Sequence, residues 1–213
     1  MNMLKKNIGT MILTSLLILL PMVVGLILWN SLPEQLPVHW NAEGQIDGYG
    51  SRALVVFGLP GLMLALHWFC AFVTTLDPKH KNISQKSFRL VLWIIPVITI
   101  PLCLLSYGTV MGMAVSVELV VPMLVGLIFV ILGNYMPKCR QNYTIGYKIP
   151  WTLNSEENWN KTHRLAGKLM VAAGFLLIAS SLLGFAFIAL FVAIALTLVP
   201  VIYSYLLYRK NQK

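Results

Sequence analysis

The sequence predicts an all-α protein that crosses a membrane six times. Of its 213 residues, 58% are hydrophobic and only 11% are charged, which is typical of polytopic membrane proteins and too apolar for a soluble domain of this size. Six apolar runs reach the roughly 20 residues that a helix needs to cross the hydrocarbon core. We place them at residues 8–29, 53–75, 88–110, 115–136, 163–183 and 186–208.

The first run follows Lys5 and Lys6, an arrangement that a signal peptide would also show. It is longer than the roughly 7–15 apolar residues of a signal peptide, and no small-x-small cleavage site follows it. We therefore expect a first membrane helix that is retained. The last two runs are separated by little more than Leu183-Gly184-Phe185, which predicts a tight helical hairpin.

The basic residues gather on one side of the predicted membrane. With the N-terminus inside, Arg52 alone lies outside, which leaves 15 of the 16 Lys and Arg residues in cytoplasmic segments. The positive-inside rule therefore predicts an N-in, C-in topology with the segment 134–164, between the fourth and fifth helices, in the cytoplasm. Because the charges cluster at the ends of apolar runs, the net charge of +9 does not indicate direct nucleic-acid binding.

The fifth run has no proline and is instead rich in small residues. Such residues allow close approach of helices and favour a central place in the bundle, although they are also ordinary in membrane helices. They are Ala172, Ala173, Gly174, Ala179, Ser180, Ser181 and Gly184.

The external segment 30–52 contains several Pro and Gly residues, which predict a compact, turn-rich loop. His39, Glu43 and Asp47 could supply metal ligands, but we favour the simpler interpretation that His39 and Trp40 lie at the lipid interface and the acids are solvated. Cys70, Cys103 and Cys139 show no C-x-x-C spacing, so neither a zinc site nor a disulfide framework is indicated. We expect no cofactor and no metal.

The cytoplasmic segment is longer than a connection between two helices requires. Pro137 should end the fourth helix, and Ile149-Pro150-Trp151 should be extended because a residue before proline avoids the helical region. Asn154 and Glu157 have capping-box spacing for a helix that begins near Ser155. On that helix Trp159 and His163 would be neighbours at i and i+4, as would Arg164 and Lys168.

Two interpretations of this segment remain open. In the first, Trp151 and Trp159 are interfacial anchors and the cations contact anionic membrane lipids. In the second, which we favour, the segment folds over the helix ends and forms a docking surface. Directional polar side chains argue for the second, since lipid anchoring needs only Lys, Arg and Trp. These side chains are Asn134, Gln141, Asn142, Thr152, Asn154, Asn158 and Asn160.

The same segment resembles the signature of the SdpI family of bacterial toxin-immunity membrane proteins. The matching residues are Gly133, Asn134, Pro137, Arg140, Asn142, Gly146, Pro150, Trp151, Thr152, Trp159, His163 and Arg164. The external segment is similar to the amino-terminal module of unknown function that precedes the signature in many members. Its matching residues are Leu36, Pro37, Val38, His39, Trp40, Asn41, Gly44, Asp47 and Gly48. Lys148 departs from the pattern where Arg is expected, which keeps the charge but loses bidentate geometry.

The resemblance implies a multi-pass protein of the bacterial cytoplasmic membrane, with an amino-terminal module at 1–75 and an SdpI-like module at 76–213. It further implies protection from a secreted peptide toxin, and signalling in which a cytoplasmic transcriptional repressor is held at the membrane. On this basis the toxin-facing residues would be Pro37, His39, Trp40, Asn41, Gly44 and Asp47. The repressor would bind the signature residues from Asn134 to Arg164.

A different class of function rests on two polar residues in the apolar runs. His67 lies inside the second run and Glu118 near the outer end of the fourth, where it is expected to contact water. Intramembrane ionisable residues are functional candidates, although a neutral His can simply bond a neighbouring helix. The alternative function is therefore a small membrane transporter or a lipid-associated envelope factor. We expect no enzyme, because no catalytic motif is present and nothing in the sequence places Cys139 and His163 as a reactive pair.

Overall fold

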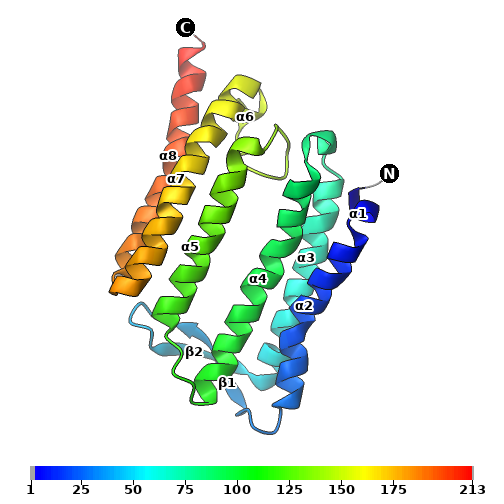
Figure 1. The fold of residues 1–213 in the computed structure, drawn as a ribbon, viewed down its shortest axis with the longest axis vertical. Helices are drawn as coiled ribbons and strands as arrows, with labels where there is room; N and C mark the ends of the chain where they lie inside the picture. The colour runs from blue at the N-terminus through cyan, green and yellow to red at the C-terminus, as the bar shows by residue number, and fades with distance from the viewer. Residues whose placement is uncertain (1–2, 213) are drawn as a thin grey trace. The chain divides into compact units, whose positions relative to one another are not determined.

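A computed structural model describes residues 3–212, apart from the side chains of residues 186–188. In this part of the chain, six helices are long and apolar enough to cross a membrane, which confirms the six predicted runs (Figure 1). They span Ile8–Ile27, Leu54–Thr75, Gln85–Val110, Val117–Lys138, Glu156–Leu183 and Ala189–Lys210.

The chain forms two compact units that are interleaved in the sequence. The first unit contains the residues up to Thr75 together with Phe88–Glu118, and the second contains Leu76–Ser87 and Leu119–Lys213. The third membrane helix therefore packs mostly within the first unit, although the sequence assigned it to the SdpI-like module. The division into modules at 1–75 and 76–213 stays a prediction.

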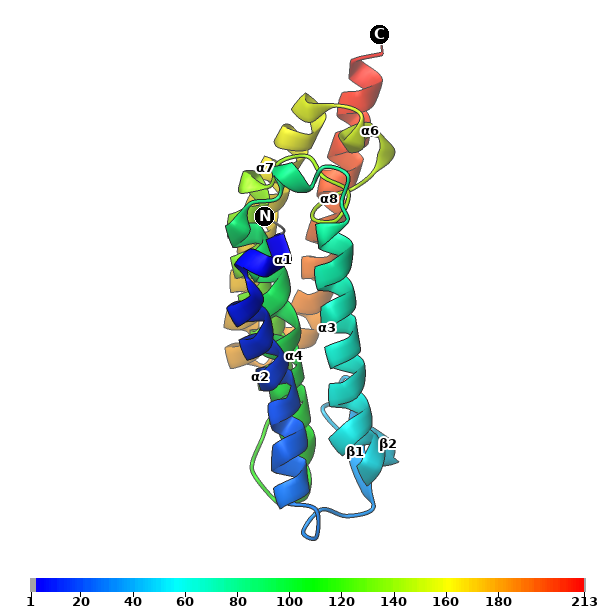
Figure 2. The same ribbon diagram turned by 90° about the vertical axis from the view of Figure 1, so that its right-hand side faces the viewer.

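The first unit consists of helices with a short hairpin at one end (Figure 2). Its elements are α1 (Met3–Lys6), α2 (Ile8–Ile27), β1 (Gln35–Trp40), β2 (Ile46–Ser51), a π-helical turn (Leu54–Gly58), α3 (Leu59–Thr75) and most of α4 (Gln85–Val110). Figure 2 shows the hairpin at the ends of α2 and α3 away from the N-terminus. Leu36, Val55 and Tyr107 meet in the core beneath it.

The hairpin corrects the prediction of an all-α protein with a turn-rich external loop. β1 and β2 pair antiparallel, with register irregularities on either side of His39. Leu36 and Pro37 are buried, and the Ser106 hydroxyl of α4 donates a 2.6 Å hydrogen bond to the Pro37 carbonyl. Pro and Gly in this segment concealed the strands from sequence reasoning, because both residues are uncommon inside strands.

The second unit contains α5 (Val117–Tyr135), a 3₁₀ turn (Met136–Lys138), α6 (Pro150–Leu153), α7 (Glu156–Leu183) and α8 (Ala186–Lys210). A second 3₁₀ turn (His80–Asn82) lies in its first segment. Helix α7 ends at Gly184, which has φ +78° and donates its N–H to the Ser180 carbonyl. This left-handed cap turns the chain into α8, which packs along α7 in the tight hairpin that the sequence predicted.

Paired glycines bring α5 and α7 into backbone contact. A Cβ added at Gly174 would lie 2.5 Å from the Gly126 carbonyl oxygen, and one at Gly167 would lie 2.7 Å from the Gly133 carbonyl oxygen. Larger residues would push the helices apart at both places. The small residues of the fifth helix thus serve close helix packing, as in other membrane bundles.

Two local predictions in the segment before α7 were wrong. Ile149 is extended as expected, but Pro150 and Trp151 begin α6, because proline is well suited to the first turn of a helix. Helix α7 is capped by Ser155 rather than by Asn154: the Ser155 hydroxyl accepts a 3.2 Å hydrogen bond from the Asn158 N–H. Asn154 instead ends α6 in a helical conformation.

Candidate functional site

Two short segments of the second unit, residues 77–82 and 136–163, form a folded polar structure that we call the platform. Asp77 joins them. Its carboxylate accepts hydrogen bonds from the Tyr143 N–H (2.8 Å), the Thr144 hydroxyl (2.9 Å) and the Lys79 N–H (2.7 Å). The side chain is only 3% exposed, so these donors replace the water that the carboxylate has lost.

Gln141 makes a second connection between the segments. Its amide nitrogen donates to the carbonyl oxygens of Thr152 (2.9 Å) and Leu153 (2.8 Å), and its side-chain oxygen accepts from the Lys79 ammonium. Its own carbonyl oxygen accepts a 2.7 Å bond from the Asn82 amide. One side chain thereby ties the end of α6 to the loop before α4.

Asn142 shapes the turn that follows. Its side-chain oxygen accepts hydrogen bonds from the Thr144 N–H (2.9 Å) and the Ile145 N–H (2.6 Å), while its amide donates to the Arg140 carbonyl (2.8 Å). Asn142 is 2% exposed. Its role in this structure is to hold the backbone, because no face of the side chain is open to a partner.

Trp159 and His163 stack, as their i and i+4 spacing predicts, with ring centroids 3.9 Å apart. The Trp159 indole donates to the Cys139 carbonyl at 2.8 Å. His163 bonds the Trp159 carbonyl through Nδ1 (2.8 Å), and its Nε2 accepts the Tyr147 N–H (3.1 Å). This pair of bonds requires the neutral ring with its proton on Nδ1. A Cβ at Gly146 would overlap Nε2 of His163, which explains why glycine is needed there.

The α6 turn is fastened to the loop before it and to α8. The Thr152 hydroxyl donates to the Tyr147 carbonyl at 2.6 Å, and the Trp151 indole donates to the Ser204 hydroxyl at 2.6 Å. Asn158 adds a 2.8 Å bond from its amide to the Ser204 carbonyl. Ser204 therefore accepts hydrogen bonds from two side chains of the platform.

Burial separates the predicted partner-binding residues into two groups. Asn142, Thr152, Trp159 and His163 are at most 2% exposed, so they hold the platform together and do not present themselves to a partner. Gly146 and Trp151 are half-buried. The exposed members are Asn134, Pro137, Arg140, Pro150 and Arg164.

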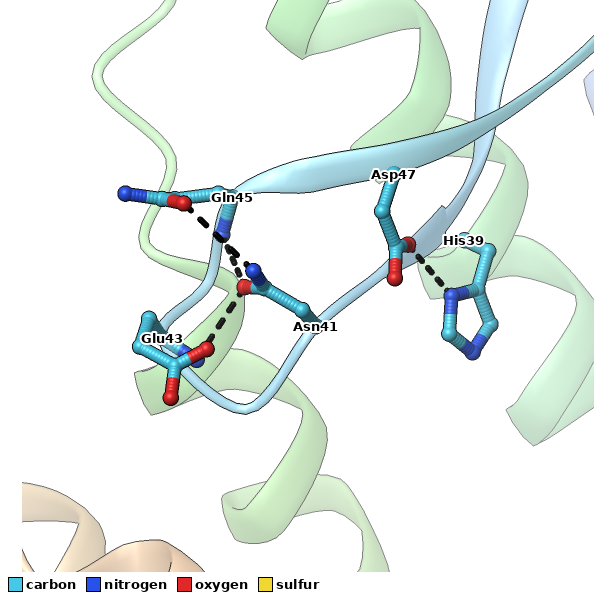
Figure 3. Close-up of polar contacts among 5 residues, drawn as sticks. All are labelled: His39, Asn41, Glu43, Gln45 and Asp47. Atoms are coloured by element: carbon cyan, nitrogen blue, oxygen red, sulfur yellow. Dashed lines mark hydrogen bonds and ion pairs between the residues drawn. The ribbon is translucent and has the colours of Figure 1, made fainter.

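The β1–β2 hairpin of the first unit carries the predicted toxin-facing residues, of which Figure 3 shows His39, Asn41 and Asp47. His39 Nδ1 and Asp47 Oδ1 lie 2.5 Å apart across the two strands, and their side chains are 71% and 45% exposed. Pro37 is buried, and Trp40 is half-buried. The His39–Asp47 pair is thus a polar group that the hairpin presents to its surroundings.

Asn41 organises the turn between the strands. Its side-chain oxygen accepts from the Gln45 N–H at 2.8 Å and from the Glu43 N–H at 3.1 Å, as Figure 3 shows. Gly44 has φ +71°, a conformation that glycine adopts readily. Glu43 does not join His39 and Asp47, and among the described residues no group of three or more His, Cys, Asp or Glu side chains could hold a metal.

Arg52, the one basic residue predicted outside, fixes the hairpin to the segment that follows α2. Its guanidinium donates to the Trp29 and Leu32 carbonyls, both at 2.8 Å, and lies 4.3 Å from the centroid of the Trp29 ring. These bonds give partners to carbonyl groups of the connection between α2 and β1.

His67 and Glu118 lie in very different surroundings within the first unit. His67 is 1% exposed, and its Nε2 bonds the Thr14 hydroxyl of α2 at 3.0 Å, the contact with a neighbouring helix that the simpler interpretation expects. Glu118 is exposed in the first turn of α5. A Cβ at Gly44 would lie 2.7 Å from its Oε1, so Glu118 rests against the hairpin turn.

Cys139 and His163 are not arranged as a nucleophile and its base. Both ring nitrogens of His163 are engaged by the backbone of Trp159 and Tyr147. Burial raises the pKa of the Cys139 thiol, although a hydrogen bond with Ser87 opposes this shift. A buried thiol with a raised pKa is a poor nucleophile.

Sequence reasoning missed Asp77, Asn82, Tyr147 and Ser204 and did not assign a site role to Gln141. Asp77 had a signal that could have been used: it is an acidic residue in a predicted cytoplasmic segment rich in Lys. Ser204 had none, since its partners Trp151 and Asn158 come from distant parts of the chain.

Comparisons with known proteins identify both polar regions. The SdpI/YfhL protein family matches residues 138–204, and a domain of unknown function (DUF1648) matches residues 16–64. The chain is 28% identical over 214 residues to the immunity protein SdpI of Bacillus subtilis (strain 168), a similarity that covers 98% of this chain and 97% of that protein. No solved structure matches. The resemblance drawn from the sequence is confirmed.

Proposed function

We propose that this chain, an SdpI-type multi-pass protein of the cytoplasmic membrane, protects a bacterial cell against a secreted peptide toxin. One observation carries the proposal: the similarity to an immunity protein extends along nearly the whole of both chains. It therefore includes the helices, the hairpin and the platform together. A shared membrane helix or two would not support a shared function in the same way.

The two matched regions also contain the parts of the chain that the membrane does not require. Residues 16–64 include the hairpin, and residues 138–204 include most of the platform. Membrane spanning needs only apolar helices. Folded polar structure at the helix ends is therefore the reasonable place for a specific function.

On the predicted outer side, the hairpin is the surface we propose for the toxin. His39 and Asp47 present a paired donor and acceptor, and Trp40 beside them is half-buried. Such a combination suits a peptide, which offers backbone polar groups and apolar side chains. Arg52 holds the hairpin on the segment that follows α2, and the Pro37–Ser106 contact holds it on α4.

On the predicted cytoplasmic side, we propose that the platform docks a transcriptional repressor. Arg140 and Arg164 are exposed and carry fixed positive charge, while the buried residues beneath them set the shape of the surface. A partner with an acidic face would suit these cations. Toxin recognition at the hairpin would then alter the docking of the repressor.

The immunity proposal is tested by survival of toxin-sensitive bacteria that express the protein. The cells are challenged with the family's peptide toxin, and colonies are compared with those of an empty-vector strain. We expect protection. Equal killing of both strains, with the protein present in the membrane fraction, would refute the proposal and direct attention to the transporter alternative.

The signalling proposal is tested separately with Arg164→Ala and the matched control Lys168→Ala. Both side chains are exposed and lie one turn apart on α7. We expect a toxin-responsive reporter gene to lose its response in the Arg164 variant and to keep it in the Lys168 variant, with immunity retained in both. An unchanged response in the Arg164 variant removes this residue from the docking surface.

A further inference from the structure

A cavity of about 310 Å³ lies in the second unit beside the start of α4 and the end of α5. Four cations line it: Lys81, Lys86, Lys138 and Arg140. Asn82, Ser84 and Tyr135 complete the described lining, which includes no acidic side chain. The hydrogen bonds that hold the hairpin and the platform together do not explain this concentration of positive charge.

None of the four cations forms an ion pair among the described residues, where the ion pairs are His39–Asp47 and Lys161–Glu157. Lys161 shows that a lysine of the same unit takes an acidic partner when one is in reach. Lys138 instead lies 5.0 Å from the Tyr135 ring centroid, a weaker interaction. Four like charges around one cavity repel each other. An anion bound inside the cavity would offset this electrostatic repulsion.

The start of α4 adds to the positive potential. Ser84 precedes the helix, and its hydroxyl accepts the Ser87 N–H at 3.0 Å. Helix N-termini carry partial positive charge and favour anions. The first turn of α4 contains Lys86 and no acidic residue, which is unfavourable unless an anion lies nearby.

The cavity is at the boundary between the apolar helices and the polar segments. Lys86 lies in the first turn of α4, and Lys138 ends the 3₁₀ turn that follows α5. The ends of membrane-spanning helices lie near the lipid headgroups, and basic pockets at such ends suit anionic headgroups. A lipid phosphate can enter such a cavity laterally from the membrane.

We propose that this cavity is a binding site for a phosphate group, and that its source is the headgroup of an anionic lipid. Lys86 and Lys138 would bind the phosphate oxygens at the boundary, with Lys81 around the polar end of the headgroup. Arg140, which also belongs to the proposed docking surface, would border the headgroup. The hydrogen bond from Asn82 to the Gln141 carbonyl fixes the position of this side chain in the lining of the site.

The test uses the purified full-length chain in a neutral detergent, with short-chain phosphatidylglycerol, short-chain phosphatidylcholine and inorganic phosphate as separate probes. Binding is followed by the rise in the thermal unfolding midpoint. The test variant is Lys86→Gln with Lys138→Gln. Its matched control is Lys148→Gln with Lys168→Gln, two exposed lysines of the same unit outside the cavity lining.

We expect phosphatidylglycerol to raise the midpoint of the wild-type chain more than phosphatidylcholine does. The apparent affinity should fall at least tenfold in the test variant, stay within twofold in the control, and recover in Lys86→Arg with Lys138→Arg. If inorganic phosphate binds as well as phosphatidylglycerol, the phosphate site stands and its source is soluble. Equal losses in the test variant and the control, or no shift with any probe, would overturn the proposal.

Discussion

The platform and the hairpin are both polar structures at the ends of membrane helices, but they use their polar side chains in opposite ways. In the platform, Asp77, Asn142 and His163 are at most 3% exposed and bond other parts of the protein. In the hairpin, His39 and Asp47 bond each other while 71% and 45% of their side chains remain exposed. The first arrangement stabilises the conformation of the platform, and the second leaves polar side chains accessible to a partner.

This difference changes how the two sets of residues that carry the resemblance are interpreted. A buried residue such as Trp159 can affect a partner only through the shape of the platform, whereas Arg164 can touch one directly. Substitutions in the platform should therefore cost stability first and function as a consequence. Substitutions of the exposed hairpin pair should cost function with little loss of stability.

The largest effect on stability is expected from Asp77→Ala. The change removes the acceptor of three hydrogen bonds and leaves the Tyr143 N–H without this partner, so we expect a loss of roughly 2–5 kcal/mol. Thermal unfolding of the detergent-purified protein, followed by tryptophan fluorescence, measures it. Glu157→Ala is the control, because that carboxylate is exposed; a midpoint as high as that of the control would contradict the role of Asp77.

Gly146→Ala should have the next largest effect. Gly146 has φ +112°, and the added Cβ would overlap His163 Nε2, the atom that accepts the Tyr147 N–H. Strain of this kind costs on the order of 1–3 kcal/mol. Thermal unfolding again provides the measurement, with Gly61→Ala as the control, since a Cβ at Gly61 meets nothing within 4 Å. Equal midpoints for the two variants would refute the close packing of Gly146 on His163.

Trp151→Phe should have a smaller effect. Phenylalanine keeps most of the ring but loses the indole N–H that donates to Ser204 at 2.6 Å, a bond worth about 1 kcal/mol. The half-buried ring also packs against Tyr205 and Tyr208, contacts that Phe can retain. A double-mutant cycle of thermal stability with Ser204→Ala isolates the bond. Additive losses would show that the two side chains are not coupled.

The sequence was sufficient for the membrane helices because each one is specified locally. Apolar length alone predicts a spanning helix, and Leu183-Gly184-Phe185 alone predicts the turn between the last two. The i and i+4 spacing likewise predicted the contact of Trp159 with His163. Each of these features depends on residues within a few positions of one another.

The interior of the platform could not be predicted in the same way. The bonds from Asp77 to Tyr143 and Thr144 join residues more than sixty positions apart, and Ser204 meets Trp151 from another helix. Polar residues show no periodicity that would reveal such partners. The hairpin was not predicted, for a different reason. Pro37, Gly48 and Gly50 are poor strand formers, and packing on α4 outweighed their local preference.

The smallest effect on stability, and the sharpest test of the comparison, is expected from Asp47→Asn. Exposed ion pairs are screened by water, so the loss should stay below about 1 kcal/mol. Asparagine keeps the size of the side chain but removes the charge that faces His39. We therefore expect an unchanged thermal midpoint together with reduced survival under toxin, while Glu43→Gln, an exposed acid of the same hairpin outside the pair, leaves both unchanged. Full protection by the Asp47 variant would mean that the exposed pair is not where the toxin is recognised, and a large fall in its midpoint would mean that the hairpin, like the platform, depends on its polar residues for shape.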